Sequence, residues 1–270
     1  MKIRCRRYRI NIDHPVVMGV LNLTPDSFYD MSRYSIDSAL KKVHEMISDG
    51  VSIVDIGGES TRPGSKNIHE ELELERIFLI VKSIVDRFDI PVSVDTSKAL
   101  VMQEMIKIGV SMINNVEDFD EKSVLSVANH KDIPICVTHN IADRSSDGKI
   151  IPSLKKYFIK NIERLRNAGI EEKRIIIDPG FGFKKTTSEN YEMLSRLEQL
   201  CSLKHPILVG ISRKSMIGDL LQIPVHDRLN GSIVCATVAA LKGAKIIRTH
   251  DVKETVQAMR IVRKIKSSQV

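Results

Sequence analysis

Two aspartates end short apolar segments of the chain and are not needed to start the helix that follows. Asp95 closes the run 92–94, and the threonine and serine after it could cap the next helix in its place. Asp178 precedes a proline and a glycine, which delay the next helix. A carboxylate in a partly dry pocket needs hydrogen-bond donors. A planar ligand edge with two parallel N–H groups would satisfy such carboxylates, and Asn114 could complete such a set of partners. In the alternative interpretation these side chains are caps and a satisfied core amide.

Arg248, His250 and Asn22 are candidates for an anion site. The planar guanidinium of Arg248 suits phosphate oxygens, and the side-chain oxygen of Asn22 could bind Mg²⁺, because hard cations prefer oxygen ligands. The alternative is that Arg248 merely pairs with Asp251.

The segment Ser212, Arg213, Lys214 and Ser215 carries polar donors at the expected start of a helix. Positive side chains there oppose the helix dipole, so these donors are predicted to face an anion or a polar ring. A solvated turn is the alternative.

The elements that must position these residues are eight short runs rich in Val and Ile, separated by segments of helical periodicity. Runs of this kind are typical of buried parallel strands. The predicted strands are 16–21, 51–56, 92–94, 111–113, 135–137, 174–177, 207–211 and 245–247. The predicted helices are 35–48, 70–87, 98–108, 121–129, 153–168, 189–199, 213–242 in two pieces, and 252–265.

Strand and helix therefore alternate eight times, which predicts an α/β protein with a closed (β/α)8 TIM barrel. An open doubly wound sheet is the alternative, although no G-x-G-x-x-G follows the first strand. Residues 1–15 are expected to form a short hairpin or arm that closes the barrel floor, and 1–270 a single domain. Because polar residues follow nearly every strand, they should meet at the C-terminal mouth, where sites of this fold lie.

Composition excludes several classes of protein. The net charge of +7 is spread along the chain, aromatic residues make up 4% and tryptophan is absent, so a nucleic-acid partner is not expected. No apolar run approaches the roughly 20 residues that span a bilayer, so no membrane partner is expected either. The N-terminus does not resemble a secretory signal. Four scattered cysteines suggest neither a disulfide framework nor a zinc site, which favours a cytoplasmic location.

Six segments resemble those of dihydropteroate synthases, in the same order and at similar separations. They are MGVLNLTPDSF (18–28), VDIGGESTRPGS (54–65), SVDTSK (93–98), IIIDPGFGF (175–183), VGISRKSMIG (209–218) and RTHDVKETV (248–256). The resemblance runs from about residue 14 to residue 265. It implies a transferase of folate biosynthesis that joins 6-hydroxymethyl-7,8-dihydropterin pyrophosphate to 4-aminobenzoate, releasing dihydropteroate and pyrophosphate.

The resemblance also implies roles for individual residues. Pterin would be bound by Asp95, Asn114, Asp178 and Lys214, and pyrophosphate by Asn22, Arg248 and His250, with Asn22 as a ligand of the cofactor Mg²⁺. The 4-aminobenzoate pocket, where sulfonamides compete, would include Thr61, Arg62, Pro63, Phe183 and Ser215. Catalysis would rest on Asp95, Lys214, Arg248 and His250. The family is usually homodimeric through its C-terminal helices, and loops 22–34 and 57–68 act in it as mobile covers.

This chain departs from the family pattern around two strands. It has Asn114-Asn115 where the family has Asn-Asp, and Thr138-His139-Asn140 where the family has Met-His-Met. Because threonine packs less apolar area against a pterin than methionine does, weaker substrate binding is the resulting hypothesis. Two alternatives remain open: a non-catalytic or weakly active pterin-binding relative, and a barrel that transfers a methyl group from a methyl-folate to a corrinoid protein. The Ser-Arg-Lys segment, Arg248 with His250, and the Thr61-Arg62-Pro63 loop argue against the methyltransferase, and the anion-site residues argue against the non-catalytic relative.

Overall fold

The computed structural model describes residues 1–23, 33–59, 68–117, 119–141 and 149–268. Its centre is a barrel of parallel strands in the order β8-β7-β6-β5-β4-β3-β10-β9. The strands are β3 (Val16–Asn22), β4 (Ile53–Gly57), β5 (Val92–Asp95), β6 (Met112–Asn115), β7 (Ile135–Thr138), β8 (Ile175–Asp178), β9 (Leu208–Val209) and β10 (Ile246–Thr249). A parallel bridge between Ile177 and Ile207 joins β8 to the start of β9, and the Ile177 N–H donates to the Pro206 carbonyl at 3.0 Å. The predicted closed barrel is confirmed, and the open-sheet alternative is wrong.

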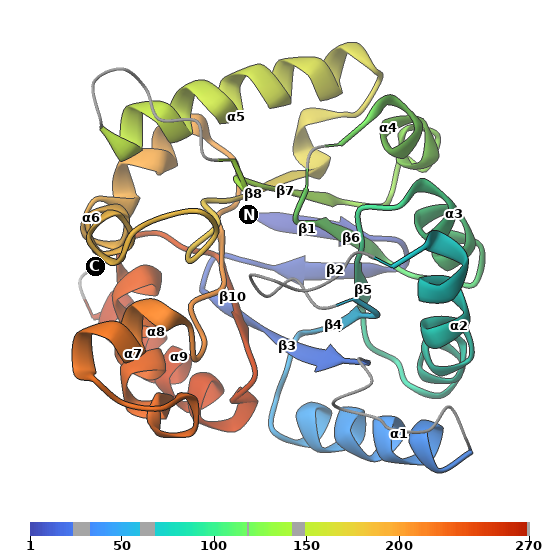
Figure 1. Ribbon diagram of the computed structural model, residues 1–270, viewed down its shortest axis with the longest axis horizontal. Helices are drawn as coiled ribbons and strands as arrows, with labels where there is room; N and C mark the ends of the chain where they lie inside the picture. Colours follow the sequence, from blue (N-terminus) through green and yellow to red (C-terminus); the bar gives the residue numbers. More distant parts are fainter. Residues whose placement is uncertain (24–32, 60–67, 118, 142–148, 269–270) are drawn as a thin grey trace.

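Helices surround the strands (Figure 1). They are α1 (Arg33–Ser48), α2 (Glu70–Arg87), α3 (Ala99–Lys107), α4 (Glu121–Ala128), α5 (Ile150–Asn167), α6 (Thr187–Ser195), α7 (Ser215–Leu221), α8 (Leu229–Leu241) and α9 (Val252–Ser267), with 3₁₀ turns η1 (Glu172–Arg174), η2 (Leu197–Leu203) and η3 (Val225–Asp227). The single helix predicted over 189–199 is wrong in one respect, because the chain breaks at Arg196 into α6 and η2. The seventh predicted strand, 207–211, is shorter in the structure.

The predicted hairpin at the barrel floor is confirmed. Strands β1 (Lys2–Cys5) and β2 (Tyr8–Asn11) pair antiparallel and lie across the ring of strands in Figure 1. The hairpin side chains Ile3, Cys5 and Ile10, with Ile12 directly after β2, pack in one buried cluster with Met18, Ile53, Met112, Cys136, Ile176, Leu208 and Ile246 of the barrel. These barrel residues form an apolar layer that fills the lower interior. The polar site is therefore restricted to the upper end.

Candidate active site

A ring of polar side chains lies inside the barrel, directly above the apolar layer of its floor. Because successive strand residues face opposite sides of a sheet, the residue two positions after an inward apolar residue also faces inward. Asp55, Asn114, Thr138, Asp178 and Arg248 each lie two positions after an apolar floor residue, and Asp95 lies two positions after the buried Ser93. These six side chains form one ring, with Asn22 at the end of β3. Apart from Asn22 and Arg248, which are partly exposed, all of them are buried. Of the strand-end residues predicted to meet at one mouth, Asp95, Asn114 and Arg248 are joined there through contacts of Arg248 and Asp55.

Arg248 forms the cationic centre of the ring. Its Nε donates to Asp55 Oδ2 at 2.6 Å, and its Nη2 donates to Asp95 Oδ2 at 2.8 Å. Burial by itself would lower the pKa of Arg248, but the charges of Asp55 and Asp95 outweigh it and raise that pKa. The guanidinium is therefore always charged. The alternative that Arg248 pairs with Asp251 is wrong, since Arg213 occupies that carboxylate.

Asp55 is a member of this ring that the sequence interpretation missed. It lies inside β4, between Val54 and Ile56, is fully buried, and accepts a hydrogen bond from Asn114 Nδ2 at 3.3 Å as well as from Arg248. The available signal was a carboxylate within an apolar strand, two residues after the inward-facing Ile53. A charge buried there requires a partner, which indicates a site and not a helix cap.

Several buried oxygens of the ring have no hydrogen-bond partner among the described residues. They are Asp55 Oδ1, Asp95 Oδ1, Asn114 Oδ1 and Thr138 Oγ1. Burial raises the pKa of Asp95 to about 7, with Arg248 opposing the shift and Asp55 adding to it. Buried acceptors without donors are rare in folded proteins, so their gathering here favours a ligand that brings N–H groups.

Asp178 and Lys214 form the opposite side of the ring. The Gly180 N–H donates to Asp178 Oδ1 at 2.8 Å, and burial raises the pKa of Asp178 while the Lys214 charge lowers it. Lys214 Nζ donates to the Phe181 carbonyl and lies 4.6 Å from the centre of the Phe183 ring. Burial lowers the pKa of Lys214 to about 8, against the attraction of Asp178. Lys214 thus lies over the Phe183 ring and close enough to Asp178 for their charges to interact.

The remaining predicted residues lie at the rim. Asn22 Oδ1 lies near Gly57, 3.9 Å from the position that a Cβ on this glycine would occupy. His250 is exposed, and its backbone N–H and Nδ1 each lie 3.2 Å from Ser212 Oγ. Ser215 is exposed at the first residue of α7. Thr61, Arg62 and Pro63 lie outside the described residues.

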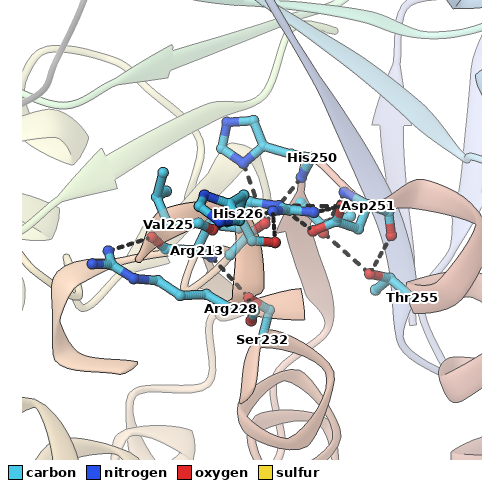
Figure 2. A network of polar contacts seen from close by, with 10 residues as sticks. Arg213, Val225, His226, Arg228, Ser232, His250, Asp251 and Thr255 are labelled. Atoms are coloured by element: carbon cyan, nitrogen blue, oxygen red, sulfur yellow. Dashed lines mark hydrogen bonds and ion pairs between the residues drawn. The ribbon is translucent and has the colours of Figure 1, made fainter. Parts of the chain in front are cut away.

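The prediction that all donors of the Ser212 to Ser215 segment face a ligand is wrong for Arg213. Its guanidinium makes a two-point ion pair with Asp251, with Nη2 2.7 Å from Oδ1 and Nε 2.9 Å from Oδ2 (Figure 2). The charge that opposes the helix dipole is therefore neutralised by a carboxylate of the protein itself.

A second lysine that sequence reasoning missed supports the turn after β8. Lys185 Nζ donates to the carbonyls of His139, Gly180 and Phe183 at 3.0, 2.8 and 3.1 Å. Burial lowers the pKa of Lys185 to about 8, and burial together with the Lys185 charge lowers the pKa of His139 to about 3. His139 is therefore neutral. By bonding the three carbonyls, Lys185 holds the turn that follows Asp178 against the end of β7.

Comparison with known proteins agrees with this geometry. Residues 18–250 match a family model described as pterin binding enzyme. The chain is 43% identical to the dihydropteroate synthase of Escherichia coli over 97% of this chain and 95% of that protein. This chain belongs to the dihydropteroate synthase family. Its reaction is dihydropteroate synthesis, a group transfer in folate biosynthesis.

Solved dihydropteroate synthases superpose closely on the barrel. A Yersinia pestis dihydropteroate synthase in a sulfonamide drug complex has a TM-score of 0.93 and 40% identity, covering 99% of this chain and 100% of that one. Dihydropteroate synthase from Xanthomonas albilineans in complex with 7,8-dihydropteroate has a TM-score of 0.89 and 30% identity, covering 98% of each chain. The predicted resemblance is confirmed, and the corrinoid methyltransferase alternative is set aside. In the part of the chain described, every helix is too short or too polar to cross a membrane.

Proposed function

We propose that dihydropteroate forms at this mouth by condensation of 6-hydroxymethyl-7,8-dihydropterin pyrophosphate with 4-aminobenzoate. The observation that carries the proposal is the set of unpartnered buried acceptors on Asp55, Asp95 and Asn114 beside the Arg248 cation. A pterin ring brings the N–H groups that these oxygens need, and its pyrophosphate brings negative charge to the cation.

The pterin ring is held by Asp95, Asn114, Asp178 and Lys214. Asp178 is fixed by the Gly180 N–H, and Asp95 by Arg248, so both carboxylates are oriented before the ligand arrives. Preorganised acceptors lower the entropy lost on binding. Lys214, close to Asp178, donates to the ring.

Pyrophosphate departure is assisted by Arg248 and His250. The bond between the pterin methylene carbon and the pyrophosphate oxygen breaks first, and the electron pair leaves with the oxygen. Arg248 uses the N–H of Nε and one N–H of Nη2 for the carboxylates, and its remaining N–H groups are the donors proposed for the leaving oxygens. Asp95 stabilises the positive charge that develops on the pterin. The aniline nitrogen of 4-aminobenzoate then attacks the methylene carbon and loses a proton.

The 4-aminobenzoate pocket is proposed to include Phe183 and Ser215, with Thr61, Arg62 and Pro63 of the segment 60–67. Phe183 supports this placement because its ring lies beside Lys214 at the edge of the pterin position. An aromatic ring there can stack on the benzoate ring. Sulfonamides, as 4-aminobenzoate mimics, are expected to compete at the same place.

Magnesium is the proposed cofactor, with Asn22 as its protein ligand. Among the described residues, no group of three His, Cys, Asp or Glu side chains could hold a metal ion. One amide oxygen at the mouth fits an ion held mainly by phosphate oxygens and water, which is how proteins commonly bind Mg²⁺. When bound, the ion would neutralise charge on the departing pyrophosphate.

The protein is further proposed to be a homodimer that acts in the cytoplasm. Helix α8 has no charged residue, and exposed apolar side chains gather on α7, α8, α9 and the η3 turn: Leu220, Leu221, Val225, Val234, Leu241, Ile261 and Ile265. A second copy that covers these helices would remove the apolar surface from water. The free cysteines Cys5, Cys136, Cys201 and Cys235 fit a reducing compartment.

One assay tests the proposed reaction. The protein is incubated with the pterin pyrophosphate, 4-aminobenzoate and Mg²⁺, and dihydropteroate is measured. Asp178→Ala is expected to abolish pterin binding and Arg248→Ala to impair chiefly the use of the pyrophosphate, whereas Asp89→Ala, at an exposed carboxylate, serves as the control. Pterin binding without product would indicate the non-catalytic relative. Tight pterin binding by Asp178→Ala would overturn the ring assignment.

A further inference from the structure

Arg213 adopts a backbone conformation that is unfavourable for its residue type. Its φ is +57°, in the left-handed region where glycine is favoured. A side chain other than glycine in this region costs on the order of 1 kcal/mol. Glycine would avoid this cost, so the contacts of the arginine side chain must be compared with it.

Arg213 joins three segments that are distant in sequence, two through its side chain and one through its backbone N–H (Figure 2). Besides its two-point ion pair with Asp251, its Nη1 donates to the carbonyls of Val225 and His226 at 3.2 and 3.0 Å. Its backbone N–H donates to Ser232 Oγ of α8 at 2.8 Å. The β9–α7 turn is thus tied to the segment after β10, to η3 and to α8.

Both partners of the ion pair are themselves held in place. The Asp251 N–H donates to Thr249 Oγ1 at 3.1 Å, and Thr255 Oγ1 donates to the Asp251 carbonyl at 2.7 Å. On the other side, Arg228 Nη1 donates to the Arg213 carbonyl at 3.1 Å. A planar guanidinium held at this many points fixes both the distance and the angle between the two segments.

The residues next to this pair belong to the site. Lys214 follows Arg213 directly, and His250 precedes Asp251. Ser212 Oγ, on the other side of Arg213, is the hydrogen-bond partner of His250. We propose that Arg213, acting through Asp251, is a positioning residue that sets the pterin-side Lys214 against the pyrophosphate-side His250. The inference rests on the proposed function, since those two roles come from it.

Two glycine substitutions separate the side chain from the backbone strain. Arg213→Gly relieves the positive φ and removes the ion pair, whereas Lys204→Gly relieves the same strain, at φ +61°, in an exposed residue at the end of η2. Arg213→Gly is expected to lower kcat/KM by about 10- to 100-fold, because small displacements of catalytic groups cost that much. Lys204→Gly should remain within about twofold of the unsubstituted protein.

Binding measurements distinguish positioning from a general loss of structure. Inhibition by inorganic pyrophosphate with Mg²⁺ should weaken in Arg213→Gly by about tenfold, while 6-hydroxymethylpterin, held largely by Asp95, Asn114 and Asp178, should bind within about twofold of normal. Arg213→Lys should restore part of the activity, since lysine keeps the charge but not the fork. The double variant Arg213→Gly with Asp251→Asn should be no worse than Arg213→Gly alone.

Full activity of Arg213→Gly would overturn the proposal. Equal loss of pterin and pyrophosphate affinity would also overturn it, because the side chain would then maintain only the fold. If the unsubstituted protein forms no dihydropteroate, the proposed reaction fails, and the two binding measurements still decide whether Arg213 positions the anion side of the site.

Discussion

At the scale of single residues, the site contains two groups whose proton equilibria lie close to neutral pH. Asp95 must be ionised to accept N–H groups of the pterin, and burial raises the pKa of Asp95 to about 7. Lys214 must be protonated to donate, and burial lowers the pKa of Lys214 to about 8. Activity should therefore rise as the pH rises through 7 and fall as the pH rises through 8.

The pH dependence of kcat/KM for the pterin substrate checks this expectation. Lys214→Arg should move the alkaline limb to higher pH, since a guanidinium keeps its proton throughout this range. Lys185→Arg is the matched control, because the pKa of Lys185 is also lowered to about 8 while its ammonium bonds only backbone carbonyls. If Lys185→Arg moves the alkaline limb of the pH profile and Lys214→Arg does not, the assignment of this limb to Lys214 is contradicted.

At the scale of elements, the approach of the β8 turn to the end of β7 requires a glycine. Gly180 has φ +71°, and a Cβ built there would lie 2.1 Å from the His139 carbonyl oxygen. Gly169 has a similar φ of +86° but no atom within 4 Å of such a Cβ. The pair separates backbone strain, which both positions share, from a steric clash that only Gly180 has.

Gly169→Ala should therefore cost on the order of 1 kcal/mol of the free energy of unfolding. Gly180→Ala should cost at least about 3 kcal/mol and weaken pterin binding, because a shift of the turn moves the Gly180 N–H that holds the Asp178 carboxylate. Urea unfolding and a pterin titration measure both effects. Equal losses of stability in the two variants would show that the clash is relieved without moving the turn.

At the scale of the whole molecule, the apolar surface of the C-terminal helices is the basis for the proposed dimer. Val234→Glu in α8 and Ile261→Glu in α9 place a charge at side chains that are 61% and 63% exposed. Each is expected to convert the dimer to a monomer, because a charge in a dry interface costs several kcal/mol. Leu79→Glu, at a side chain 60% exposed on α2, is the control.

Sedimentation at several protein concentrations would check this prediction. A monomeric unsubstituted protein would refute the dimer outright, and dissociation by Leu79→Glu alone would move the interface to another face of the barrel.

The sequence by itself was sufficient for the barrel and for much of its polar ring. Buried parallel strands need continuous apolar runs, so eight such runs separated by helical periodicity leave few other arrangements. Asp95, Asn114 and Asp178 could be identified because each ends such a run, where the residue must face either the mouth or a helix start. The floor hairpin followed from its place before the first strand.

Only the tertiary structure decided which charges meet. Asp251 is three residues from Arg248 in sequence, yet strand alternation points Arg248 into the barrel, where it pairs with Asp55 and Asp95. Asp251 pairs instead with Arg213, which is 38 residues away in sequence. The place of Asp55 within an apolar strand signalled that the carboxylate needs a partner, but local sequence does not tell which cation supplies it. Partner choice depends on distances between strands that are far apart in the chain, and those distances exist only once the barrel has closed.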